Sequence, residues 1–328
     1  MRIRRNIRNL SAEDKARFVA ALIKLKKDGK FDKYVHWHHE AMMKPTSLPG
    51  EPVDAMGYRN AAHRGPVFFP WHREFLKRLE MELGDIEKDI GIPYWDWTQD
   101  AGLPDGATSP IWADDFMGGN GVGKERIVET GPFAYKNGNW PLVQAHGSRP
   151  ELQRDFRKWA LEGLPNKDDV KVAMSESIYD IFPWNANPFT LGFRNKCEGW
   201  VSPEADQNFG KPGRQLHNRV HRWVGGTMLQ MVSPNDPIFF LHHSFCDKLW
   251  AIWQKQMIGM GATKEDTYAP HVGGPLGHNI DDQMEPWDSK TTPKSVLDHQ
   301  ALGYAYDDEA LSTTHELLNK QILIKQHF

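Results

Sequence analysis

The feature that most constrains this 328-residue chain is the spacing of the histidines between residues 213 and 254. His217 and His221 lie four residues apart in a segment with helical spacing, so both side chains project from one face of a helix. Two imidazoles at that spacing can bind one metal ion from a single rigid element. The sequence therefore predicts a metal site that includes this helix.

A second helix follows, in which Pro237 fits the first turn and Asp236 fits the N-terminal cap. It carries two adjacent histidines, His242 and His243, which point about 100° apart, so only one of them joins the first pair. His243 shares its helix face with Asp247, and a carboxylate beside a ligand often supports it by a hydrogen bond. We therefore predict His243 as the ligand and Asp247 as its support, with His242 as the alternative.

Another set of histidines lies upstream. His63 and His72 are nine residues apart, and Pro66 and Pro70 exclude one continuous helix across them. We expect His63 on a loop and His72 in the first turn of a helix that begins near Pro70 and continues to residue 86 with helical spacing of its apolar residues. A third histidine for this set comes from an earlier helix, which offers three candidates: His36, His38 and His39.

Two groups of three histidines without a cysteine or carboxylate ligand indicate a particular chemistry. Neutral imidazoles suit copper, zinc, iron or nickel, whereas hard cations such as calcium require oxygen ligands. Hydrolytic two-metal sites usually bring carboxylates as well. These considerations favour a pair of copper ions that reacts with dioxygen, and a dizinc hydrolase is the alternative.

Five segments, four of which contain these histidines, resemble the type 3 copper family of tyrosinases, catechol oxidases and haemocyanins, and within it the compact bacterial tyrosinases. They are YVHWH, HRGPVFFPWHREFL, PYWDW, LHNRVHRWVGG and NDPIFFLHHSFCDKLWAIW. The resemblance extends over most of the chain and implies two copper ions as cofactors. It assigns the ligands of the first copper as His38, His63 and His72, and those of the second as His217, His221 and His243.

The resemblance also implies residues that handle the substrate. Hydroxylation of a monophenol requires loss of its proton, and in bacterial tyrosinases an Asn and a Glu are thought to hold a water molecule for this step. The matching positions are Asn218 and Glu198, for which a helix-surface amide and a surface ion pair are the alternatives. Met231 matches a position that overhangs the second copper in relatives, with core packing as its alternative. Arg222 is proposed from its charge and its place next to His221, where it could bind a substrate carboxylate at the entry, with a salt bridge as the alternative.

Because most of these histidines lie on helices, we expect a mainly α fold with a central four-helix bundle that holds the dicopper site. Long irregular loops, a few short strands and a single domain over residues 1–328 complete the expectation. Residues 98–140 are rich in Gly, Pro, Asp and Asn, which is typical of loops. Two surface helices are expected over residues 149–162 and 167–181.

Composition limits the partners and the location. The net charge of −3 gives no reason to expect nucleic acid, and the absence of an 18-residue apolar run gives none to expect a membrane span. The two cysteines, Cys197 and Cys246, exclude a disulfide scaffold. The basic N-terminus lacks an apolar segment, so a cytoplasmic location is the default expectation, with export on a carrier protein left open.

The sequence thus predicts a copper-dependent phenol oxidase that hydroxylates monophenols at the ortho position and oxidises o-diphenols to o-quinones. Its partners are a phenolic substrate and dioxygen, and a homodimer and a copper-delivery or carrier protein are further candidates. Three alternatives share the same ligands: an o-aminophenol oxidase, a catechol oxidase without hydroxylase activity, and a haemocyanin-like oxygen carrier.

Overall fold

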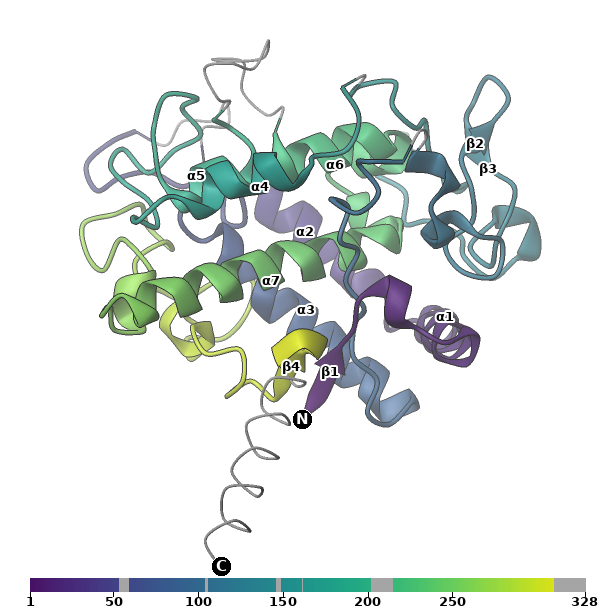
Figure 1. Ribbon diagram of the computed structural model, residues 1–328, viewed down its shortest axis with the longest axis horizontal. Helices are drawn as coiled ribbons and strands as arrows, with labels where there is room; N and C mark the ends of the chain where they lie inside the picture. Colours follow the sequence, from purple (N-terminus) through teal and green to yellow (C-terminus); the bar gives the residue numbers. More distant parts are fainter. Residues whose placement is uncertain (53–58, 104–105, 146–148, 161, 202–214, 310–328) are drawn as a thin grey trace, which may run out of the picture.

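Residues 1–52, 59–103, 106–145, 149–160, 162–201 and 215–309 are described by a computed structural model (Figure 1). Its α-helices are α1 (Ala12–Lys27), α2 (Asp32–Met43), α3 (Phe68–Ile86), α4 (Lys167–Met174), α5 (Phe193–Glu198), α6 (Leu216–Val224) and α7 (Ile238–Gly259). The strands are β1 (Arg2–Arg4), β2 (Gly121–Val122), β3 (Ile127–Val128) and β4 (Tyr304–Tyr306). Short 3-10 helices occur at Ile7–Asn9, Gly106–Thr108, Pro110–Trp112, Tyr135–Asn137, Gly226–Leu229, Ser233–Asn235, Glu265–Thr267 and Lys294–Val296.

Four helices, α2, α3, α6 and α7, form the centre of the molecule. Figure 1 shows α7 crossing the middle, with α6 above it and α3 below it, and both helices pack against α7. Phe75 of α3 stacks on Phe240 of α7 with ring centroids 5.7 Å apart, and Tyr34 of α2 meets Phe75 edge-on at 5.5 Å. The expected mainly α fold with a central bundle is confirmed.

Two of the bundle helices, α3 and α7, begin close to the predicted prolines. Pro237, and not the predicted Asp236, is the cap residue of α7, while the carboxylate of Asp236 accepts a hydrogen bond of 3.1 Å from the backbone N–H of Ile238. Pro70 lies in the first turn of α3, where its missing N–H leaves no helical hydrogen bond unmade. Most of the side chains of α7 are buried on every side, because the helix lies at the centre of the fold.

The N-terminal strand closes the fold against a distant segment. Strand β1 pairs in parallel with β4, so that Arg4 lies opposite Tyr306. The buried guanidinium of Arg4 donates to Glu80 of α3 at 3.0 Å and to Asp247 of α7 at 3.0 Å. These buried contacts attach β1 to α3 and α7.

The expected surface helices are only partly present. Helix α4 ends at Met174, and the described residues between 149 and 160 form no helix. The buried guanidinium of Arg154 explains the second difference, because it pairs with both carboxylate oxygens of Asp236 at 2.8 Å. Its backbone N–H donates to the carbonyl of Arg126 at 3.1 Å, so this segment is held by contacts with other loops.

None of the helices described here is both long enough and apolar enough to cross a membrane.

Candidate metal centre

The first group of histidines combines two helices and a loop. His38 lies on α2, His63 on the loop before α3, and His72 on α3, as the spacing predicts. Their ring centroids are 4.8 to 6.0 Å apart, and one nitrogen of each lies within 4.8 Å of the others. His38 is buried, whereas His36 on the same helix is exposed, so the structure brings His38 into this group.

Backbone carbonyls fix the orientation of two of these rings. His38 Nδ1 lies 2.7 Å from the carbonyl oxygen of Met231, and His72 Nδ1 lies 2.7 Å from that of Phe68. A carbonyl only accepts, so Nδ1 carries the proton and Nε2 keeps its lone pair. The Nε2 atoms of both rings are buried and have no hydrogen-bond partner in the described part of the chain, as expected for a nitrogen that faces a metal ion.

The loop that carries His63 is fixed by hydrogen bonds to one of its own residues, Asn60, and to Glu198 of α5. Asn60 Oδ1 accepts hydrogen bonds from the backbone N–H groups of Ala62 (3.1 Å) and His63 (2.8 Å). Arg64 adopts the left-handed conformation with φ of 61°, and its N–H donates to Glu198 Oε1 at 2.7 Å. The loop therefore presents His63 in a defined position, although it has no regular secondary structure.

The second group combines α6 and α7. The Nε2 atoms of His217 and His221 lie 3.3 and 3.4 Å from Nε2 of His243. His221 Nδ1 lies 2.7 Å from the carbonyl of Met228, and His217 Nδ1 lies 3.0 Å from Asn218 Oδ1. Both contacts turn the Nε2 atoms toward His243, so three nitrogens converge on one point.

The structure favours His243 over His242. All four histidines of this region lie close together, but only Nε2 of His243 makes the short approach to both His217 and His221. The ring of His242 instead stacks on His217 at 5.1 Å, and its Nδ1 faces the thiol of Cys246 at 4.0 Å. The assignment of His243 from helix spacing thus agrees with the geometry.

The two groups lie next to each other. The rings of His72 and His243 stack with centroids 4.2 Å apart, and those of His63 and His217 are 6.3 Å apart. Phe239, one turn before His243, packs against it at 4.0 Å and against His38 at 5.1 Å. Phe239 was not predicted from the sequence, although its i,i+4 spacing to His243 could have identified it as a wall of the site.

Burial keeps these imidazoles neutral. It lowers the pKa of His38 to about 3 and that of His221 to about 4, against the pull of the backbone carbonyls that accept from them. Burial also lowers the pKa values of the other four histidines, and neighbouring histidines lower them further. Six neutral nitrogen donors in two adjacent groups fit a pair of copper ions.

The predicted support by Asp247 is wrong. Asp247 accepts hydrogen bonds from Arg73 Nε at 2.6 Å, Arg4 Nη1 at 3.0 Å and the hydroxyls of Tyr304 and Tyr306. Nδ1 of His243, by contrast, is buried and has no partner among the described residues. The carboxylate therefore joins α7 to α3 and β1, because two buried guanidinium groups attract it more strongly than an imidazole would.

Glu198 and Asn218, the two residues predicted to hold a water molecule, both contact His217. The backbone carbonyl of Glu198 lies 3.3 Å from His217 Nδ1, and its carboxylate accepts from Arg64 N–H and, at 3.0 Å, from Arg194 Nη1. Burial raises the pKa of Glu198, and the charge of Arg194 opposes that shift. Nδ2 of Asn218 is buried and makes no hydrogen bond with any described residue, so it is a candidate amide donor beside the second group.

The two predicted entry residues occupy different settings. Met231 has a side chain that is 42% exposed, while its carbonyl holds His38 of the first group. Its backbone role was not visible in the sequence. Arg222 follows His221 on α6 with a half-buried side chain.

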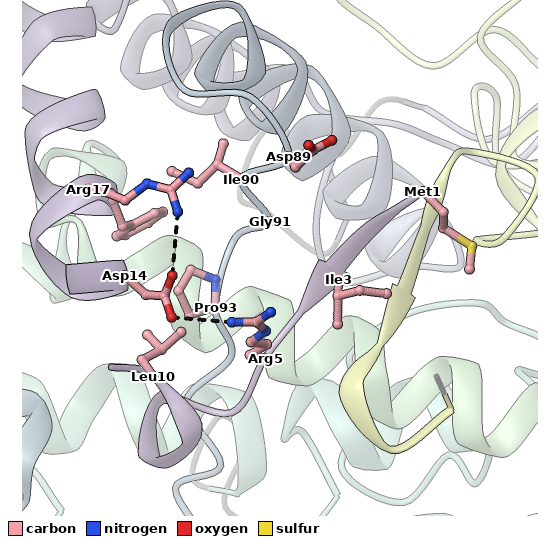
Figure 2. A pocket seen from close by; sticks show the side chains of 11 residues that line it. Met1, Ile3, Arg5, Leu10, Asp14, Arg17, Asp89, Ile90, Gly91 and Pro93 are labelled. Carbon is pink, nitrogen blue, oxygen red and sulfur yellow. Dashed lines mark hydrogen bonds and ion pairs between the residues drawn. The ribbon is translucent and has the colours of Figure 1, made fainter. Parts of the chain in front are cut away.

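A separate cavity of about 240 Å³ lies between β1, α1 and residues 89–93 (Figure 2). Asp14 at its edge pairs with Arg5 at 3.2 Å and with Arg17 at 3.6 Å. None of the residues lining it belongs to either histidine group, so it is not the metal centre.

Comparisons with known proteins agree with this geometry. A family model described as the common central domain of tyrosinase matches residues 28–256. A tyrosinase of Streptomyces glaucescens is 38% identical over 94% of this chain and 100% of its own length. A tyrosinase of Streptomyces antibioticus is 40% identical over 91% of this chain and 97% of its own length. A grixazone synthase of Streptomyces griseus is 35% identical over 93% of this chain and 99% of its own length.

Solved structures share the fold at low sequence identity. A tyrosinase of Burkholderia thailandensis superposes with a TM-score of 0.59 at 17% identity over 93% of this chain and 73% of that one. A functional unit of octopus haemocyanin superposes with a TM-score of 0.57 at 20% identity over 94% of this chain and 68% of that one. At these low sequence identities, the two similarities show a shared fold and nothing about activity.

Proposed function

The chain belongs to the tyrosinase family and is a copper oxidoreductase that takes two copper ions, and from this premise we propose that it acts on both classes of phenol. It hydroxylates monophenols at the ortho position and oxidises o-diphenols to o-quinones, using dioxygen. The convergence of two buried groups of neutral histidines carries this proposal. Bound copper supplies the exchange of electrons with dioxygen, and the protein supplies the donors and the approach of the ring.

His38, His63 and His72 bind one copper in this proposal, and His217, His221 and His243 bind the other. Two observations support the assignment. The Nε2 atoms of His38 and His72 are buried without partners among the described residues, and those of His217 and His221 lie 3.3 and 3.4 Å from Nε2 of His243. Proton-bearing Nδ1 atoms on backbone carbonyls prevent the rings from turning away.

Glu198 and Asn218 hold a water molecule that takes the proton of a monophenol. The carboxylate of Glu198 is fixed by Arg64 N–H and Arg194, and both Glu198 and Asn218 contact Nδ1 of His217. Nδ2 of Asn218, which has no hydrogen-bond partner among the described residues, supplies a donor. A base in a fixed position assists proton loss before the phenolate approaches the metal. Oxidation of an o-diphenol depends less on such a base.

Substrate enters beside Met231 and Arg222. The exposed thioether of Met231 is flexible and leaves space for an aromatic ring, and Arg222 offers a cation for a substrate carboxylate.

The test is oxygen uptake by the copper-loaded protein with tyramine, and then with dopamine as the matched o-diphenol. Uptake with both is expected. His63→Ala and His217→Ala each remove one ligand and are expected to abolish both reactions, while His36→Ala, an exposed histidine of α2, preserves them. Oxidation that persists in both ligand variants would refute the assignment, and uptake with dopamine alone would refute the hydroxylase activity.

A further inference from the structure

The rings around the six histidines are almost all resistant to oxidation. Phe68, Phe75 and Phe239 pack against them, and phenylalanine is the aromatic side chain that gives up an electron least readily. Within the described part of the chain, Trp71 is the one tryptophan or tyrosine whose ring contacts this centre. Its indole lies 5.0 Å from the ring of His72 and 6.0 Å from that of His38.

Trp71 is the first member of a row of indoles that reaches the surface. Its ring lies 5.0 Å from that of Trp287, and Trp287 lies 6.2 Å from Trp37. Trp71 and Trp287 are buried, whereas Trp37, on α2, is only partly buried. Three oxidisable rings in successive contact therefore connect the metal centre with solvent.

The hydrogen bonds of the buried indoles favour movement of an electron without a proton. Trp71 Nε1 donates to the carbonyl oxygen of Glu285 at 2.6 Å, and an amide carbonyl is too weak a base to take that proton. Nε1 of Trp287 is buried and has no partner among the described residues. Oxidation of either ring leaves a radical cation that keeps its proton and is readily reduced again.

The cations beside these rings are compensated by carboxylates. Arg78 lies 5.1 Å from the ring centroid of Trp287, and Glu74 pairs with it at 2.8 Å. Lys33 lies 5.5 Å from the ring of Trp37 and forms an ion pair with Glu82. The positive charge that an indole acquires on oxidation is thus not opposed by an unpaired cation at either position.

We propose that Trp71, Trp287 and Trp37 form an electron-transfer path that reduces the oxidised copper centre when no phenol is bound; this inference rests on the proposed function. One electron passes from Trp71 to the centre. Trp287 then reduces the oxidised Trp71, and Trp37 reduces the oxidised Trp287. A soluble one-electron donor such as ascorbate reduces Trp37 at the surface. Each passage thus reduces the centre by one electron, oxidises one donor molecule by one electron and breaks no bond in the protein.

The path predicts where a radical appears when the donor is withheld. Copper-loaded protein is mixed with hydrogen peroxide and a nitroso spin trap, without phenol or ascorbate, and examined by EPR spectroscopy and peptide mapping. The expected result is a spin adduct on Trp37 that is absent from the metal-free protein. Trp71→Phe and Trp287→Phe are each expected to reduce the Trp37 adduct to the level of the metal-free protein.

The controls separate this path from packing and from the proposed function. Among the described ring contacts, Trp287 packs against Trp71 and Trp37 and against no histidine of the centre. The copper content of Trp287→Phe is therefore expected to stay at the wild-type value even if Trp71→Phe changes it. Trp97→Phe removes a buried indole that packs on Phe245, outside the row, and should leave the adduct unchanged. A Trp37 adduct that persists in both path variants, or that is absent from wild type while phenols are oxidised, would overturn the path. Copper-bound protein that neither oxidises phenols nor forms the adduct would overturn the proposed function, and the path with it.

Discussion

The backbone N–H of Arg64 donates a 2.7 Å hydrogen bond to the carboxylate of Glu198. Arg64 directly follows His63 of the first histidine group, and the carbonyl of Glu198 lies 3.3 Å from Nδ1 of His217 in the second. Glu198 therefore contacts both the loop residue that follows His63 and the ring of His217. A substitution at Glu198 should therefore affect the region between the two histidine groups, where we propose that a monophenol loses its proton.

We expect Glu198→Gln to separate the two reactions. The amide can still accept from Arg64 N–H, but it cannot act with water as a base, so kcat/KM for a monophenol should fall by about a hundredfold. The value for the matched o-diphenol should change far less. Steady-state oxygen uptake with tyramine and dopamine, at equal copper content, measures both values.

Glu176→Gln provides the matched control, because Glu176 also pairs with a basic residue of α5, Lys196, but makes no contact with either group of histidines. It should leave both rates unchanged. An equal loss of the two activities in Glu198→Gln would show that the carboxylate serves structure and not proton removal.

The positions of the histidines could be predicted from local sequence, because helix spacing and proline placement are local properties. The i,i+4 pair His217 and His221 and the proline-bounded His63 needed no knowledge of distant contacts. The choice of His243 also proved consistent with the structure. The predicted support of His243 by Asp247 is absent, because Asp247 pairs with Arg4 and Arg73 instead.

Contacts between distant segments account for what could not be predicted. Asp247 pairs with Arg4 and Arg73, which lie 243 and 174 residues away in sequence, and no local sequence pattern predicts these pairs. Arg154 likewise reaches Asp236 across 82 residues and holds its segment out of the helix that its composition favours. The carbonyl of Met231 that orients His38 is invisible in a sequence, because every residue has a carbonyl.

Adjacent histidines allow a direct test of the ligand assignment. His243→Asn should reduce the copper content to about one ion per chain, because one of three donors at the second position is lost. His242→Asn should retain both ions, since its ring stacks on His217 and does not approach both Nε2 atoms. Elemental analysis of the purified variants measures the content. Loss of copper from the His242 variant alone would reverse the assignment.

The metal-free protein should lose stability as the pH falls below neutrality. Burial lowers the pKa of His38 to about 3 and that of His221 to about 4, whereas both titrate near 6.5 in an unfolded chain. Between these values the unfolded state binds more protons, so protonation favours unfolding, and each such histidine contributes up to about 1.4 kcal/mol per pH unit. Urea denaturation of the metal-free protein between about pH 7 and pH 5 tests this.

A variant pair controls that measurement. His38→Asn removes one buried histidine and should reduce the dependence of the free energy of unfolding on pH by about one proton. His36→Asn removes an exposed histidine of the same helix and should leave the dependence nearly unchanged. Identical slopes in wild type and both variants would contradict the effect of burial.

Asp247→Asn should affect stability and leave the metal content intact. Burial would raise the pKa of Asp247, but Arg73 and Arg4 outweigh it and lower the pKa to about 2, below the ordinary value of 3.8. The stabilisation is therefore present above pH 3.8 and is lost as the pH falls toward 2, and its size is about 2 kcal/mol.

Replacing the carboxylate leaves two buried guanidinium groups without a counterion, at a cost of about 3 to 5 kcal/mol. Urea denaturation of the metal-free variant, with Asp28→Asn at the exposed pair with Lys24 as the control, measures that cost. Because His243 makes no contact with Asp247, both copper ions should remain at neutral pH, and loss of the second copper would restore Asp247 as its support.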